Sequence, residues 1–111
     1  MPIVVRQDLS ASAIAIACSH GSLAGYLKWK DDQIVKHWID PIINKAFFKR
    51  IYKCKFKENN LNILEVFNNI KKWNYERIIL TESALDNMET CIIFKPIKWS
   101  NSLYFTDLEL Y

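Results

Sequence analysis

The stretch VVRQDLSASAIAIACSHGSLAG, residues 4–25, joins two patterns that together favour an α/β fold. It opens on a β-branched run without polar alternation, which is typical of a strand buried on both faces. Between Leu9 and Leu27 no side chain carries a formal charge, and Ala, Gly and Ser predominate. Small side chains let a helix lie close to a sheet. We therefore expect a strand over 2–6 and a helix over about 11–29.

Length and composition fit a single domain that covers residues 1–111. A chain of this length can bury roughly two-thirds of its unfolded surface. Half of its residues are hydrophobic, so a core can form without disulfides or metals. The net charge of +3 is mildly basic, which permits a nucleic-acid partner without requiring one.

The three cysteines, Cys18, Cys54 and Cys91, lie far apart and are flanked by apolar residues. This spacing is typical of reduced thiols in a cytoplasmic protein, and it predicts neither a metal site nor a bound cofactor. The apolar run Ala13–Cys18 is shorter than the core of a secretory leader or a membrane-spanning helix. We therefore expect no membrane partner.

The rest of the chain alternates between helix-like and strand-like periodicity. Helical patterns cover 31–45, with a break at Pro41, and 59–73; strand patterns cover 47–57, 77–80 and 90–94, with a further short strand suggested at 108–110. A polar loop follows at 81–87. Short buried strands between helices are typical of an α/β sandwich around a small mixed sheet.

Four lysines, Lys49, Lys53, Lys55 and Lys57, share one face of the strand expected over 47–57. Such a row could follow a phosphate backbone, where each lysine adds salt-dependent affinity. Lysines on an exposed edge strand also prevent two sheets from associating edge to edge. The pattern favours the edge-strand interpretation, and Lys53 and Lys55 remain candidate RNA contacts.

Four strings in order resemble the type II peptidyl-tRNA hydrolases. They are VVRQDL (4–9), AIACSH (15–20), TCIIFKPI (90–97) and TDLELY (106–111). The resemblance implies a three-layer α/β/α sandwich with a small four-stranded mixed sheet. It also implies tRNA as a partner, and hydrolysis of the ester that joins a peptide to the 3′ ribose of tRNA.

The resemblance implies a site built from three candidate catalytic residues, Asp8, His20 and Glu82. Asp8 matches the aspartate of the opening motif, His20 matches the histidine of the helix, and Glu82 stands where the loop aspartate belongs. Arg6 also matches the opening motif. Ser83 or Thr81 would replace the threonine hydroxyl of the loop, and we count Ser83 among the binding residues together with Arg6.

Strand ends point to the same region without the resemblance. Asp8 follows the first strand, while Glu82 and Asp86 follow the strand over 77–80. Open α/β sheets place their sites at the carboxyl ends of strands, so we expect both loops to meet in one crevice with Asp8 within reach of Glu82. Asp86 is a further candidate binding residue in that crevice.

The chain departs from the family pattern at Ala13 and Ala17, where the family has a lysine and a glutamine. Alanine removes the charge-assisted hydrogen bonds that such a lysine would make. Three interpretations stay open: a divergent hydrolase, a module that binds tRNA or a nucleotide without chemistry, and a protein-interaction domain that forms a homodimer.

Overall fold

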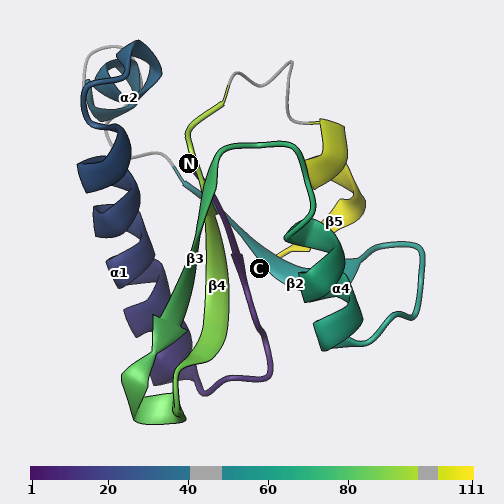
Figure 1. Cartoon of the computed structure of the whole chain (residues 1–111). Helices are drawn as coiled ribbons and strands as arrows, with labels where there is room; N and C mark the ends of the chain where they lie inside the picture. The colour runs from purple at the N-terminus through teal and green to yellow at the C-terminus, as the bar shows by residue number, and fades with distance from the viewer. Residues whose placement is uncertain (41–48, 98–102) are drawn as a thin grey trace.

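The computed structural model describes residues 1–40, 49–97 and 103–111, which form one mixed sheet with helices on both faces (Figure 1). The strands are β1 (Pro2–Val5), β2 (Arg50–Phe56), β3 (Arg77–Glu82), β4 (Met88–Phe94) and β5 (Leu108–Leu110), in the spatial order β3-β4-β1-β2-β5. The helices are α1 (Ala11–Trp29), α2 (Gln33–Ile39) and α4 (Ile63–Ile70), with short 3₁₀ helices η1 (Ser83–Leu85) and η3 (Leu103–Asp107). The expected α/β class is confirmed.

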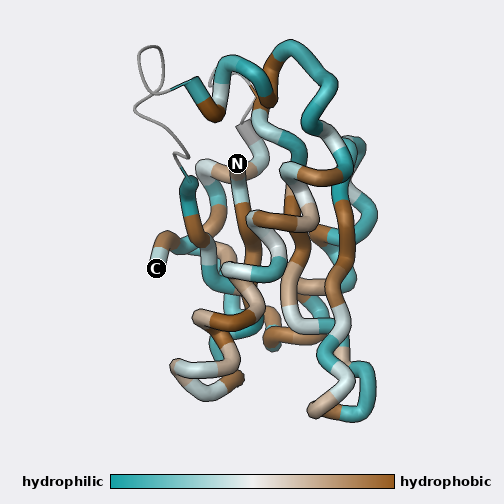
Figure 2. The backbone as a smooth tube through the Cα atoms, turned by 90° about the vertical axis from the view of Figure 1, so that its left-hand side faces the viewer, coloured by the Kyte–Doolittle hydropathy of each residue, from teal (hydrophilic) through white to brown (hydrophobic). Residues whose placement is uncertain are grey.

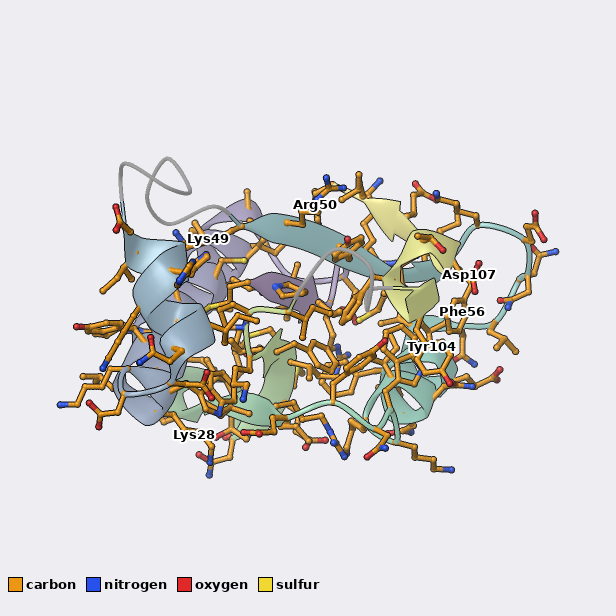
Figure 3. All side chains as sticks on the ribbon, turned by 90° about the horizontal axis from the view of Figure 1, so that it is seen from above. Lys28, Lys49, Arg50, Phe56, Tyr104 and Asp107 are labelled. Carbon is orange, nitrogen blue, oxygen red and sulfur yellow. The ribbon has the colours of Figure 1, made fainter. Side chains whose placement is uncertain are left out.

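The two faces of the sheet carry separate hydrophobic cores. Successive side chains of a strand point to opposite faces. Ile3 and Val5 accordingly pack with residues of α1 and α2, whereas Val4 packs with residues of α4. The hydropathy of the chain follows this layering, with apolar residues along the strands and polar ones in many of the connections (Figure 2). Seen from above, Lys28 lies on the α1 side and Phe56 on the α4 side (Figure 3).

The sheet has five strands, so the expected number of four is wrong. β5 pairs antiparallel with β2, with Leu110 opposite Tyr52 and Leu108 opposite Phe56. Three alternating residues carry too weak a pattern to reveal which strand they join. The partner strand lies more than fifty residues earlier, and only the folded chain brings the two together.

The position of β5 also overturns the edge-strand interpretation of the lysine row. β2 lies between β1 and β5, and the edges of the sheet are β3 and β5. Lys53 and Lys55 therefore belong to a strand that is paired on both sides, and they do not protect a free edge.

The helix expected over 11–29 is confirmed as α1. Its cap is Ser10, whose Oγ accepts a hydrogen bond from the Ala13 N–H at 3.2 Å. The buried residues of the helix are spaced by four: Ala17, Gly21, Gly25 and Trp29.

The two glycines of α1 allow its close approach to β4. A Cβ atom on Gly21 would lie 2.8 Å from Ile93 Cγ1, and one on Gly25 would lie 2.8 Å from Met1 Cε. Contacts this short cannot form without displacing neighbours. The small residues of the opening stretch thus set the distance between helix and sheet.

The two further α-helices of the described residues begin later than expected, at Gln33 and at Ile63. α2 begins after Asp32, whose Oδ1 accepts the Ile34 N–H at 3.0 Å, and it ends at Ile39; the expected break at Pro41 lies outside the described residues. α4 begins after Asn62, whose Oδ1 accepts the Glu65 N–H at 2.9 Å. In both cases a capping side chain sets the start.

The sequence also led us to expect reduced thiols and no membrane-spanning helix. Cys54 and Cys91 are buried, Cys18 is half-buried, and all three are free. Within the described segments, no helix combines the length and apolar character needed to cross a bilayer.

We expect Gly21→Leu to lower the free energy of unfolding by at least about 2 kcal/mol, because the added side chain would overpack the contact with Ile93. Urea denaturation followed by circular dichroism measures this. Ala15→Leu, at an exposed position of the same helix, should stay within about 0.5 kcal/mol of the parent. Equal effects of the two substitutions would contradict the close packing described here.

Candidate functional site

The carboxyl ends of β1 and β3 lie at the same end of the sheet, as the sequence predicted. Val5 of β1 and Leu80 of β3 both pair with Cys91 of the intervening strand β4. The segments that follow these two residues therefore leave the sheet at the same rim. This is the edge at which open α/β sheets place their sites.

One hollow at this rim brings together two of the three candidate catalytic residues. It has a volume of about 240 Å³ and is lined by Ser12, Ala13, Ala17, His20, Glu82 and Thr90. We call it the His20–Glu82 hollow. Residues from the first turns of α1 and from the β3–β4 hairpin line it. Figure 1 shows the start of α1 beside this hairpin.

The polar groups of the His20–Glu82 hollow are of three chemical kinds. The His20 imidazole is exposed on α1. Glu82 Oε1 accepts the Ala84 N–H at 3.2 Å, a bond that anchors the carboxylate at the end of β3. The Thr90 hydroxyl donates to Leu80 O at 3.4 Å. A base, a carboxylate and a hydroxyl group thus surround one small cavity.

Asp8 lies apart from this group. Arg6 holds it in a fork, with Nε donating to Oδ1 at 3.1 Å and Nη2 to Oδ2 at 2.8 Å. These hydrogen bonds lower the pKa of Asp8 below its ordinary value. Asp8 lines a different hollow from His20 and Glu82. The shared rim was anticipated from the sequence, but the structure does not bring the three candidates into one crevice.

The hollow that contains Asp8 lies beside the ends of β1 and β2. It has a volume of about 580 Å³ and is lined by Arg6, Gln7, Asp8, Cys54, Lys55 and the segment 59–64. We call it the switch-point hollow, because β1 and β2 continue to opposite faces of the sheet at this place. The run of amides at 59–62 was the sequence signal that could have indicated it.

The two lysines singled out as RNA contacts share one acidic partner. Lys53 Nζ lies 3.1 Å from Glu109 Oε1, and Lys55 Nζ lies 3.3 Å from Glu109 Oε2. The hydrogen bond from Lys53, followed by that from Lys55, lowers the pKa of Glu109. Part of the positive charge of this strand is therefore neutralised by β5.

The hairpin residues Ser83 and Asp86 are exposed and do not line the His20–Glu82 hollow. Asp86 has a φ of 54° and ends η1 in the left-handed region, as aspartate at a turn often does. The hydroxyl groups beside His20 come from Ser12 and Thr90 instead. Sequence reasoning missed Thr90 because it begins a run that matches a buried strand.

The described residues contain no group of three or more His, Cys, Asp or Glu side chains that could hold a metal ion. A further hollow of about 740 Å³ lies between α1 and α2, with Leu23, Tyr26 and Trp38 in its lining. Its described lining includes neither carboxylate nor imidazole. The two hollows at the rim are therefore the better candidates for chemistry.

No family model, curated protein or solved structure matches this chain.

We expect Asp8→Asn to lower the free energy of unfolding at pH 7 by up to about 1 kcal/mol, a small effect because the ion pair is partly exposed. The folded pKa of Asp8 lies below its unfolded value, so ionised Asp8 stabilises the fold above about pH 4. That contribution is lost as the pH falls through the lowered pKa. The difference between Asp8→Asn and the parent should therefore disappear in urea titrations at strongly acidic pH.

Glu58→Gln provides the control for this titration, because Glu58 is exposed and forms no ion pair among the described residues. It should match the parent at both pH values. A cost of Asp8→Asn that persisted in acid would show that the carboxylate charge is not what stabilises the fold.

Proposed function

We propose that this protein hydrolyses the ester of peptidyl-tRNA or of a related acylated RNA, and that the reaction takes place in the His20–Glu82 hollow. The observation that supports this most is the shared cavity: an imidazole from α1 and a carboxylate from β3 line one hollow at the carboxyl edge of the sheet. Ester hydrolysis needs a group that takes a proton from water, and imidazole is the commonest such base.

In the proposed reaction His20 accepts a proton from a water molecule whose oxygen attacks the ester carbonyl carbon. A new C–O bond forms, and the carbonyl becomes a tetrahedral oxyanion. When it collapses, the bond to the 3′ oxygen of the ribose breaks, and His20 returns the proton to that oxygen. We propose that, in this reaction, the imidazole N–H donates to the Glu82 oxygen that Ala84 does not use, which orients the ring.

The oxyanion needs hydrogen-bond donors, and the first turn of α1 offers backbone N–H groups. The Ala13 N–H is taken by Ser10 Oγ, and the Ile14 N–H by Ser10 O. The Ser12 N–H has no acceptor within the helix, as is general for first-turn groups. Ser12 lines the hollow, so its N–H is our candidate oxyanion donor.

A second candidate function is RNA binding without chemistry, which Ala13 and Ala17 favour. Both alanines line the same hollow, at the positions where the resembled family has a lysine and a glutamine. No Lys or Arg side chain is among its described lining residues. Loss of one oxyanion-stabilising donor typically costs about 100- to 1,000-fold in rate. The protein would then retain the fold and the RNA while turning over slowly or not at all.

We expect purified protein to release N-acetyl amino acid from N-acetyl-aminoacyl-tRNA, and His20→Ala to slow this release at least about 100-fold, because the general base is lost. Glu82→Gln should slow it less, since the amide still accepts a hydrogen bond. Single-turnover assays with radiolabelled substrate measure both rates.

The chain supplies its own matched control in His37, its second histidine, which is exposed on α2 and outside the hollow. His37→Ala should keep the parent rate. If the parent itself shows no release above buffer at micromolar concentration while binding the tRNA, the binding function replaces the hydrolase.

A gain-of-function variant tests the role of Ala13 directly. Ala13→Lys would introduce an ammonium group at the hollow, and we expect the single-turnover rate to rise at least about tenfold through added oxyanion stabilisation. Ala15→Lys adds the same charge to an exposed position of α1 outside the hollow and should leave the rate unchanged. Equal increases for both variants would indicate general attraction of RNA and would argue against a catalytic hollow.

A further inference from the structure

β1 and β2 are parallel neighbours whose chains leave the sheet toward opposite faces. β1 leads into α1 on one face, and β2 leads into α4 on the other (Figure 1). At such a switch point the two connections part and leave a crevice outside the carboxyl ends of the strands, where open α/β sheets bind ligands. The switch-point hollow lies at this place, because residues that follow β1 and β2 line it.

The polar groups on the floor of the switch-point hollow are paired with one another. The floor therefore carries little net charge. Gln7 Oε1 accepts the Cys54 N–H at 2.9 Å, and Gln7 Nε2 donates to Cys54 O at 3.3 Å. The side-chain amide thereby extends the pairing of β1 with β2 by one step. Arg6 and Asp8 neutralise each other beside it. This part of the hollow is preorganised, which lowers the entropic cost of binding.

The walls include polar side chains such as Lys55 and Asn60 and apolar ones such as Leu61 and Leu64. Lys55 has a side chain that is 54% exposed, and its ammonium shares Glu109 with Lys53. Asn60 is exposed, and its amide has no partner among the described residues. Leu61 and Leu64 expose 42% and 54% of their surface and also line the hollow.

We propose that the switch-point hollow binds a nucleotide unit, that is, a base with its ribose and one phosphate. The exposed leucines give a planar base an apolar surface, and a carboxamide such as that of Asn60 can both donate to and accept from the edge of a base. The Lys55 ammonium binds the phosphate. The volume of about 580 Å³ lies within the range of small-molecule sites.

The position of this hollow relates it to the His20–Glu82 hollow. The Arg6 N–H donates to Thr90 O at 3.1 Å, so the linings of the two hollows are joined by one backbone hydrogen bond. A nucleotide near the 3′ end of an RNA could occupy the first hollow while its ester reaches the second across the segment 6–10. Identification of the ligand with an RNA end rests on the proposed function; the nucleotide site does not.

The test is a ¹⁵N NMR titration of the full chain with four probes: adenosine 5′-monophosphate, the RNA trinucleotide CCA, adenosine, and inorganic phosphate. We expect the first two to shift the backbone amides of Lys55 and of 59–64 at millimolar concentration or below. Adenosine and phosphate alone should bind at least about tenfold more weakly, because each lacks half of the contacts. Tighter binding of CCA than of the mononucleotide identifies an RNA end as the source, and equal binding identifies a free nucleotide.

Two pairs of variants separate the site from the general charge of the surface. Lys55→Gln and Asn60→Ala should each weaken binding about five- to tenfold. Lys57→Gln and Asn68→Ala alter the same residue types at exposed positions outside the hollow and should leave affinity unchanged. Preserved spectra outside the altered residue show that each variant is folded.

The nucleotide site is overturned if millimolar nucleotide leaves 59–64 unshifted, if the shifts cluster around His20 instead, or if phosphate alone reproduces them. If the protein binds nucleotide but hydrolyses no ester, the proposed hydrolase function is wrong and the nucleotide site is supported. If it hydrolyses the ester without any shift at 59–64, the nucleotide site is wrong and the hydrolase function is supported.

Discussion

The contact between α1 and β4 is the constraint on which the arrangement of the rim depends. Ala17, Gly21 and Gly25 present almost no side chain to the sheet, so the helix axis lies close to the strand. Near the rim, the Cys91 thiol donates to Ala17 O at 3.7 Å. At the far end of the helix, Trp29 Nε1 donates to Glu76 Oε2 at 3.0 Å. With these contacts at Ala17 and Trp29, α1 carries His20 alongside the β3–β4 hairpin, and a bulkier helix would move His20 away from the hairpin.

The segment 6–10 divides the rim into two environments. Arg6 is bonded through its backbone to Thr90, and the side chain of Gln7 is bonded to the backbone of Cys54. These two hydrogen bonds hold the segment between the two hollows. Thr90 lines one hollow, and Asp8 lines the other. One environment holds an imidazole and a carboxylate that suit proton transfer. The other holds amides, a lysine and leucines that suit recognition.

β5 changes the electrostatics of β2 as well as its place in the sheet. Through Glu109 it brings one carboxylate to two lysines, and the aromatic ring of Tyr111 lies 5.4 Å from Lys53 Nζ. Lys55 keeps half of its side chain exposed at the switch-point hollow. A row of charges that looks uniform in the sequence thus becomes one lysine beside a hollow and another beside the chain terminus.

The sequence by itself determined the α/β class, the extent of α1, and the two strand ends at which polar residues gather. These are local properties, because periodicity, capping and small-residue spacing act within a few residues. Only the tertiary structure decided that β5 joins β2, that Asp8 pairs with Arg6 and lines a different hollow from Glu82, and that Thr90 and not Ser83 lines the hollow of His20. Strand pairing and hydrogen bonds between residues far apart in the chain made those choices, and no local pattern encodes them.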